Sequence, residues 1–290
     1  LVELFNGISL WGSYPYNFGY SLSANHIMEY SLQFMDRVAL FDTIKFSSDV
    51  FEYPESGKEG SINLRYAFLN KRNHVRNMFS PNQGYGLEIL IKKSTSSLWG
   101  NFDYLKTEMD LYTNRKVGPF SLYGRGRYER MNGDPPDQEK LGIINIPNYY
   151  IAGTLTPGRE YMTPRGYSDK KMGDQAFMGT IELRAPVVPL DFIEVLKVIK
   201  FGKPTFALIS DFGNAWNEGS KMGDLIITTG AEFRLSLTLA NAPLFIFSYG
   251  WAQSPEKWNK DWEKLYNTDS GDAIETGPKP YFQMTLINPF

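Results

Sequence analysis

The residue types that most often carry catalysis or bind metals are scarce in this chain. It contains two histidines, His26 and His74, and no cysteine. A serine hydrolase needs a histidine beside an activated serine, and a zinc site needs several ligands at suitable spacing. His26 falls among apolar residues and His74 in a basic turn, so neither lies in such a motif. We therefore expect no enzyme activity, no catalytic residue, no metal and no cofactor.

A second group of candidate functional residues is charged and lies on two neighbouring strand candidates. Its members share one parity of the alternating pattern: Lys106, Glu108, Asp110, Arg125, Arg127 and Glu129. Such a set could line an ion-selective pore, or it could form a ladder of ion pairs across two strands. The ladder is the more frequent arrangement in sheets.

The elements that would position these residues are strands. About twelve candidates can be placed, with no helical domain, at 3–13, 19–33, 36–51, 61–73, 84–96, 101–113, 118–131, 177–188, 204–217, 225–239, 243–253 and 281–290. In 225–239, for example, Ile227 and Phe233 alternate with Glu232 and Arg234. One apolar face and one charged face predict a wet interior rather than the core of a soluble sandwich.

The connections between these candidates alternate in length. Short turns lie at 114–117 and 240–243, whereas 132–176 and 254–280 are long and polar. Outer-membrane barrels have short periplasmic turns and longer external loops, so we expect the two long connections outside the cell. An even strand count would then put both termini in the periplasm. The 189–203 connection is an exception on the short side, and its pattern fits an interfacial helix or a twisted strand extension.

Composition agrees with a membrane barrel and excludes other classes. Of the 290 residues, 42% are hydrophobic and 15% aromatic, yet no stretch approaches the ~18 consecutive apolar residues of a transmembrane helix. Aromatic residues at this frequency suit the girdles of a barrel. A net charge of −2 gives no support to nucleic-acid binding. We treat 1–290 as one domain; its start, Leu-Val-Glu, predicts a processed or trimmed product and leaves room for upstream domains.

The last strand candidate, 281–290, ends on an aromatic residue. Its apolar parity consists of Phe282, Met284, Leu286 and Phe290. Gln283 and Thr285 lie on the other parity. A terminal aromatic on such a strand is typical of outer-membrane barrels, whose last strand pairs with the first to leave no open edge in lipid.

Several motifs in order resemble the bacterial surface antigen superfamily of outer-membrane barrels. They are 164–167 (Pro-Arg-Gly-Tyr), 180–186 (Thr-Ile-Glu-Leu-Arg-Ala-Pro), 210–216 (Ser-Asp-Phe-Gly-Asn-Ala-Trp), 230–234 (Gly-Ala-Glu-Phe-Arg) and 247–250 (Phe-Ser-Tyr-Gly). Members of this superfamily include the BamA-like and TamA-like assembly factors and the two-partner secretion transporters. The resemblance covers roughly residues 60–290. It implies an all-β transmembrane antiparallel barrel, for which sixteen strands are expected, with a long external loop folded into the lumen.

The resemblance also implies a loop contact. The tip Arg165, Gly166 and Tyr167 would enter the lumen, and Arg165 would pair with Asp211 and with Glu182 as a second partner. Strand parity independently places both carboxylates on the inward face, since a charge facing lipid is costly. A guanidinium can bridge two carboxylates. The alternative is a solvated arginine in a Pro-Arg-Gly turn.

The function implied by the resemblance is assembly or insertion of outer-membrane proteins, or protein translocation, in the bacterial outer membrane. The first and last strands would form a weak seam that templates a client strand, with 282–290 on one side. The expected partners are outer-membrane lipid, an unfolded or secreted client protein, and periplasmic or accessory subunits; nucleic acid is not one. The alternative function is a passive pore or a membrane anchor for another domain.

Overall fold

The computed structural model describes residues 3–16, 24–39, 55–72, 83–136, 139–143, 149–152, 162, 164–167, 171–187, 193–195, 199–202, 204–239, 242–254 and 280–286. This part of the protein is all-β. Its helical residues are few: η1 (Ser96–Leu98) is a short 3-10 helix, and Glu139 also has 3-10 geometry. None of the described helical residues forms a segment with the length and hydropathy needed to cross a membrane.

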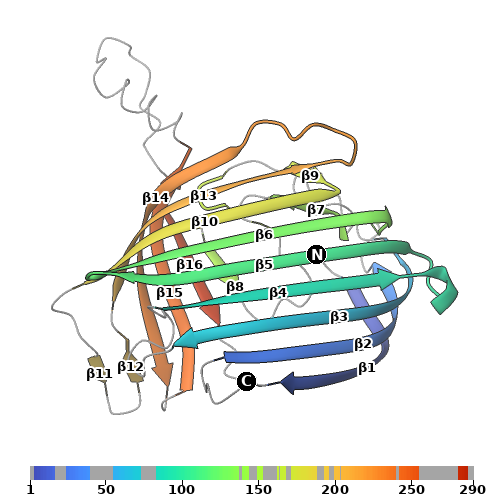
Figure 1. The fold of residues 1–290 in the computed structure, drawn as a ribbon, viewed down its shortest axis with the longest axis horizontal. Helices are drawn as coiled ribbons and strands as arrows, with labels where there is room; N and C mark the ends of the chain where they lie inside the picture. The colour runs from blue at the N-terminus through green and yellow to red at the C-terminus, as the bar shows by residue number, and fades with distance from the viewer. Residues whose placement is uncertain are drawn as a thin grey trace, which may run out of the picture.

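Eleven long strands form one sheet in which each strand is antiparallel to its neighbour (Figure 1). They are β1 (Glu3–Tyr16), β2 (Ala24–Ala39), β3 (Gly57–Arg72), β4 (Gln83–Ser94), β5 (Asp103–Val117), β6 (Phe120–Asp134), β10 (Gln175–Pro186), β13 (Thr205–Trp216), β14 (Ile226–Leu239), β15 (Ala242–Gln253) and β16 (Pro280–Leu286). The sheet follows chain order and is strongly curved. Three short strands complete its fourteen: β8 (Tyr149–Ala152), β11 (Ile193–Val195) and β12 (Ile199–Phe201).

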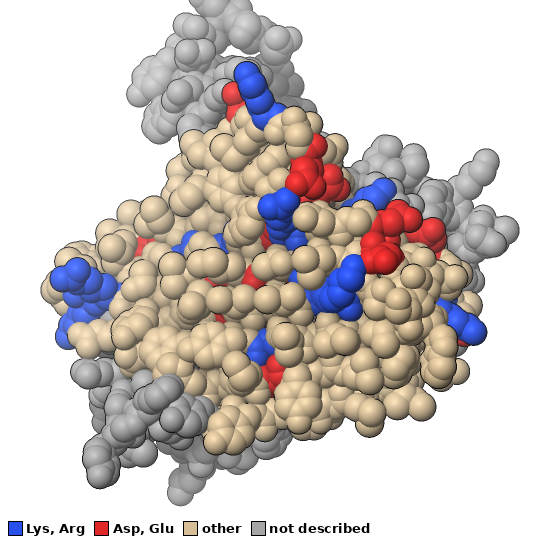
Figure 2. Space-filling view, turned by 45° about the vertical axis from the view of Figure 1, so that its right-hand side comes forward, with Lys and Arg blue, Asp and Glu red and all other residues tan. Residues whose placement is uncertain are grey.

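The two faces of the sheet differ sharply in polarity. Leu122, Leu183 and Leu208 are Cα partners across β6, β10 and β13, and all three are exposed, Leu208 to 52%. On the opposite face of the same strands, Glu182 and Asp211 are only 3% and 1% exposed. Figure 2 shows one view in which residues other than Lys, Arg, Asp and Glu make up most of the surface. Soluble proteins rarely expose so continuous an apolar face while burying their charges.

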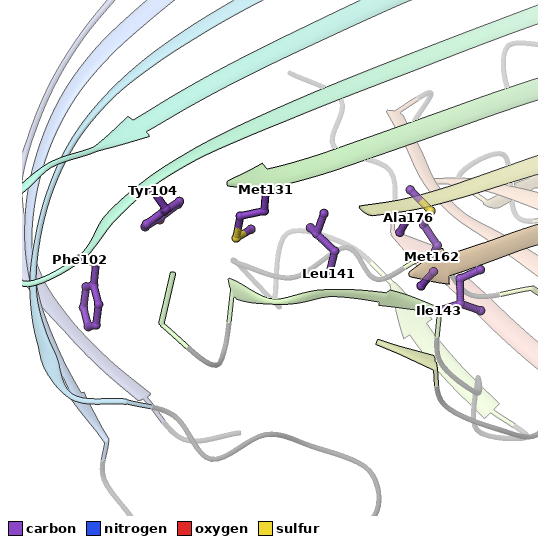
Figure 3. Packing of buried hydrophobic residues seen from close by; sticks show 8 residues of the cluster. Phe102, Tyr104, Met131, Leu141, Ile143, Met162 and Ala176 are labelled. Atoms are coloured by element: carbon purple, nitrogen blue, oxygen red, sulfur yellow. The ribbon is translucent and has the colours of Figure 1, made fainter. Parts of the chain in front are cut away.

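The long connection between β6 and β10 lies against the concave face. Its β7 (Leu141–Ile143) pairs with β9 (Lys171–Gly173) in a separate two-stranded sheet. Leu141, Ile143 and Met162 are almost completely buried and pack against inward-facing side chains of β5, β6 and β10 (Figure 3). The connection therefore covers part of the inner face instead of extending wholly into solvent.

Several strand predictions need correction. The boundary between the candidates 19–33 and 36–51 is wrong, because β2 continues to Ala39, where Ala39 is the Cα partner of Glu3 on β1. The rest of 36–51 lies outside the described residues. In the 189–203 connection the strand alternative is confirmed, since β11 and β12 form a short hairpin and β12 pairs with β14.

The described part of the chain contributes an odd number of long strands to the sheet. Ten successive antiparallel pairings separate β1 from β16, so these two strands run in the same direction. Glu3 at the start of β1 and Leu286 at the end of β16 therefore lie toward opposite ends of the strands. The periplasmic location of both termini stays a prediction. Within the described residues, β1 pairs with β2 alone and does not meet β16.

Candidate functional site

The tip of the β6–β10 connection is a tight turn. The Tyr167 N–H donates to the Pro164 carbonyl oxygen at 3.2 Å, and Gly166 has φ of 76°. Positive φ at the third position is what a type II turn requires, and glycine adopts it without strain. A Cβ on Gly166 would lie 2.0 Å from the carbonyl oxygen of Ala252 on β15. Both the turn and its close approach to the sheet thus require glycine here.

The turn presents Arg165 to Asp211 on β13. The Arg165 backbone N–H and Nε donate to Asp211 Oδ2 at 2.9 and 2.8 Å, and Nη2 donates to Oδ1 at 2.7 Å. Asp211 also accepts a 2.9 Å hydrogen bond from the hydroxyl of Thr180. Arg165 and Asp211 are 9% and 1% exposed. This is a buried, bidentate ion pair, the geometry for which arginine is better suited than lysine.

Two further carboxylates complete the surroundings of the Arg165 guanidinium. Its Nη1 donates to Glu182 Oε1 at 2.8 Å and approaches Glu232 Oε2 at 3.4 Å. Glu182 in turn accepts two bonds from Arg234, at 2.7 and 2.8 Å, and one from Arg184 at 2.7 Å. Arg234 is also paired with Glu232. We call this set the Arg165 cluster: Arg165, Glu182, Arg184, Asp211, Glu232 and Arg234.

The Arg165 cluster has room on the inner face of the sheet because several neighbouring residues on that face are small. Ala207 is the Cα partner of both Arg184 and Glu232, and it is completely buried. Gly230 and Ala252 are partners at the place where the tip of the connection approaches the sheet. The strands therefore leave room over their inner face for long arginine side chains and for the turn itself.

The charges of the cluster balance, with three arginines and three carboxylates. Burial alone would lower the pKa of Arg165, but Asp211, Glu182 and Glu232 outweigh it and hold that pKa well above its ordinary value. Arg165 is therefore a permanent cation. Deleting one member of such a buried network leaves its partner uncompensated, which costs about 3–5 kcal/mol.

A second group of ion pairs attaches the same connection to the other side of the sheet. Glu139 Oε1 accepts a 2.7 Å hydrogen bond from Arg37 Nη2 on β2 and lies 3.9 Å from Lys92 Nζ on β4. Lys92 is also 2.6 Å from Glu59 on β3, and the Tyr104 hydroxyl donates to Glu59 at 2.9 Å. Arg37 pairs with Glu59 as well. We call this set the Glu139 cluster: Arg37, Glu59, Lys92, Tyr104 and Glu139.

The structure places Arg165 against both Asp211 and Glu182, with Gly166 in the same turn. Tyr167 is half-buried beside the hydrophobic cluster of Figure 3. Glu232 and Arg234 are recognisable from the sequence as inward-facing but not as site residues, because only the strand register brings them beside Glu182. The sequence gives no indication that Glu139 is a site residue, since it lies in a connection without an alternating pattern.

The residues of the seam candidate are only partly described. Phe282 is 39% exposed and belongs to the apolar face, while Met284 and Leu286 lie at the same parity of β16. Phe290 lies outside the described residues. The 254–280 connection is described only at its two ends.

The remaining chemical candidates have structural partners. Arg125 donates to Asp110 at 2.9 Å, and Arg127 pairs with Glu129 at 2.6 Å and with Glu108 at 3.5 Å. This is the ladder alternative. His26 Nδ1 lies 2.8 Å from the Tyr66 hydroxyl, and His74 lies outside the described residues. The described part of the chain contains no group of three or more residues arranged to hold a metal ion.

Comparisons with known proteins give no family assignment. Neither a scan against protein-family models nor a search of curated proteins finds a match to this chain. The sheet and its two ionic clusters are the features of the chain that bear on its function.

Proposed function

We propose that this chain is the barrel-forming part of a bacterial outer-membrane protein that assembles or translocates other proteins. The observation that carries the proposal is the inverted polarity of the sheet. Apolar residues such as Leu122 and Leu208 are exposed, while charged residues such as Glu182 and Asp211 are buried on the inner face. Lipid against the outer face explains this inverted polarity, because exposed apolar side chains are favourable in lipid and unfavourable in water.

Strand dimensions support the same setting. Apart from β16, the long strands contain 12 to 16 residues. At about 3.3 Å per residue a 12-residue strand is roughly 40 Å long, and a tilt of ~45° gives a height of about 28 Å. This matches the hydrocarbon thickness of a bilayer, about 30 Å. Closing such a barrel antiparallel needs an odd number of further strands between β16 and β1.

The β6–β10 connection supports assembly or translocation over a passive pore. It crosses the inner face and is tied to it by Arg165 on one side and Glu139 on the other. An open channel would leave inward charges to water and permeating ions, whereas here many of them are paired with each other. In this proposal the long-connection side faces out of the cell, and β16 ends on the periplasmic side.

The test is client insertion into liposomes. The purified protein is reconstituted in vesicles of outer-membrane lipid, and a urea-denatured outer-membrane barrel protein is added as client. Folding of the client is followed by its resistance to SDS without heating. We expect folding several-fold faster than in protein-free vesicles, and slower again with Arg165→Ala. No acceleration, together with a large steady ion conductance, would instead indicate a pore.

A further inference from the structure

The connection between β4 and β5 folds over the end of the outer face and is fixed there by backbone contacts. The Asn101 N–H donates to the Lys58 carbonyl oxygen on β3 at 2.6 Å, and Asn101 Oδ1 accepts from the Lys58 N–H at 2.7 Å. The Thr95 N–H donates to the Gly60 carbonyl oxygen at 3.1 Å. Leu98 lies so close to Gly60 that a Cβ there would meet the Leu98 carbonyl oxygen at 2.0 Å. The connection is therefore a defined part of this surface.

This arrangement presents Trp99 to the outside of the molecule. Trp99 has φ of 60°, and among the described residues no other non-glycine residue has a positive φ. Positive φ is unfavourable for a residue with a Cβ, so the surrounding contacts must hold it. Trp99 is 83% exposed, and its ring lies 6.0 Å from that of Phe34 on β2. An exposed tryptophan beside an apolar face is typical of the boundary between lipid chains and headgroups, because its ring is apolar and its N–H is polar.

Two exposed lysines lie at the same end of the outer face. Lys93 is the Cα partner of Ile62 and of Leu105, which are both exposed on the apolar face. Lys58 has the same parity of β3 as Ile62, and its backbone holds the connection that carries Trp99. The outer face thus changes from apolar to cationic near Trp99. In a bilayer, this is the level at which headgroups would begin.

Each lysine has an aspartate as a neighbour. Asp103 forms an ion pair with Lys93, and their side chains are 55% and 46% exposed. Asp36 is the Cα partner of Lys58. Exposed ion pairs contribute little, because water and salt compete for both partners. A phosphate monoester carries about −1.5 to −2 charge at pH 7 and three acceptor oxygens, so it attracts an ammonium group more strongly than a single carboxylate does. Such a phosphate can therefore take Lys93 from Asp103.

We propose that Lys58, Lys93 and Trp99 form a binding site for a lipid headgroup that carries a phosphate monoester. The two lysines bind the phosphate, and the tryptophan ring lies at the level where the headgroup joins the lipid chains. The occupant is a lipid because the lysines stand at the end of an apolar face, along which its chains lie. This inference rests on the proposed function, since it requires the apolar face to contact lipid, and it names the lipid that the long-connection side binds.

The first measurement is lipid binding by a labelled chain. The native chain has no cysteine, so Ser97→Cys in η1 takes a single environment-sensitive fluorophore. The folded protein in detergent is titrated with phosphatidic acid, whose headgroup is a phosphate monoester, and with phosphatidylcholine. We expect half-saturation at a several-fold lower concentration of phosphatidic acid. Equal half-saturation for the two lipids would overturn the proposal, and so would the same response to inorganic phosphate alone, which would indicate an ion site.

Lysine variants test the recognition of the phosphate. Lys58→Gln together with Lys93→Gln should raise the half-saturation concentration of phosphatidic acid by roughly five-fold for each lysine, and leave that of phosphatidylcholine unchanged. Lys116→Gln, which alters an exposed lysine at the opposite end of the strands, is the matched control and should change neither. A double variant that binds phosphatidic acid as tightly as the native chain does would overturn the site.

Two further variants predict changes of opposite sign. Asp103→Asn should tighten the binding of phosphatidic acid, because Lys93 then has one competitor fewer. Weaker binding in this variant would contradict the role given to Lys93. Trp99→Ala should weaken the binding of both lipids, because the ring contacts the part that they share. Unchanged binding of both lipids would overturn the part of Trp99 in the site.

Failure of this site and failure of the proposed function give different results. A protein that prefers phosphatidic acid but does not accelerate client folding would refute assembly and leave the headgroup site intact. A protein that accelerates client folding but binds the two lipids equally would refute the headgroup site alone.

Discussion

Glu182 and Asp211 both contact Arg165, but they perform different tasks. Asp211 binds the side chain and the backbone of Arg165, so it holds the turn. Glu182 is shared by Arg165, Arg184 and Arg234, and therefore also compensates charge within the sheet. From the sequence, Glu182 is expected only as the second partner of Arg165. The strand register adds its contacts with Arg184 and Arg234 within the sheet. Loss of Asp211 should release the connection, whereas loss of Glu182 should also destabilise β10 against β14.

The ion pair itself is testable by a double-mutant cycle. Arg165→Ala and Asp211→Asn should each lower the free energy of docking the connection by about 3–5 kcal/mol, because each leaves a buried partner uncompensated. The double mutant should cost clearly less than the sum. The measurement is the rate of limited proteolysis within the β6–β10 connection while the sheet stays folded. Strict additivity would mean that the two residues do not act as a pair.

Gly166 offers an independent test of how the turn is seated. Gly166→Ala adds a Cβ that would meet the carbonyl oxygen of Ala252 at 2.0 Å, and it strains a residue with φ of 76°. We expect a loss of docking free energy of about 1–3 kcal/mol, seen as faster proteolysis of the connection. Gly118 is a matched control, because it also has positive φ but a Cβ added there would meet nothing within 4 Å. If Gly118→Ala released the connection equally, close approach to β15 would not be the cause.

At the scale of elements, alternation is a reliable guide, whereas register cannot be read from the sequence. Leu183 and Glu182 fall on opposite faces of β10 as their positions predict, because strand side chains have a period of two. The pairing of Glu232 with Arg165 depends on how far β14 is shifted along β13, which no local pattern states. The end of β2 is mispredicted for the same reason, since Ala39 is held in the strand by its partner on β1.

The attachment of the connection at Glu139 leads to a prediction with a defined pH dependence. Burial alone would raise the pKa of Glu139, but Lys92 and Arg37 outweigh it and lower that pKa. A lowered folded-state pKa means that Glu139 stabilises the docked connection fully above the ordinary glutamate pKa. This stabilisation is lost as the pH falls through the folded-state value.

We therefore expect pepsin to cleave near Leu141 increasingly as the pH drops below the ordinary glutamate pKa of about 4.3, when its activity is normalised to an unfolded control. Glu139→Gln should show fast cleavage at every acid pH, and with it a flat profile. A variant that keeps the wild-type pH profile would show that Glu139 is not the titrating anchor.

At the scale of the whole molecule, the proposed membrane setting rests on the two faces of the sheet. Its convex side carries exposed Leu122, Ile181 and Phe206, and its concave side carries the two ionic clusters and the buried connection. A water-soluble sheet would place these groups the other way round. The proposed function therefore requires that the apolar face contacts lipid while the polar face is enclosed.

Nitroxide scanning along β13 tests this claim most directly. Single cysteines at Phe206, Leu208 and Ile209 are spin-labelled, since the native chain has no cysteine to compete. In vesicles of outer-membrane lipid, labels at Phe206 and Leu208 should collide frequently with oxygen and rarely with a water-soluble nickel complex. The label at Ile209, on the inner face, should be shielded from lipid-dissolved oxygen. Equal oxygen collision at all three positions, or free access of nickel to Leu208, would contradict the lipid-facing assignment.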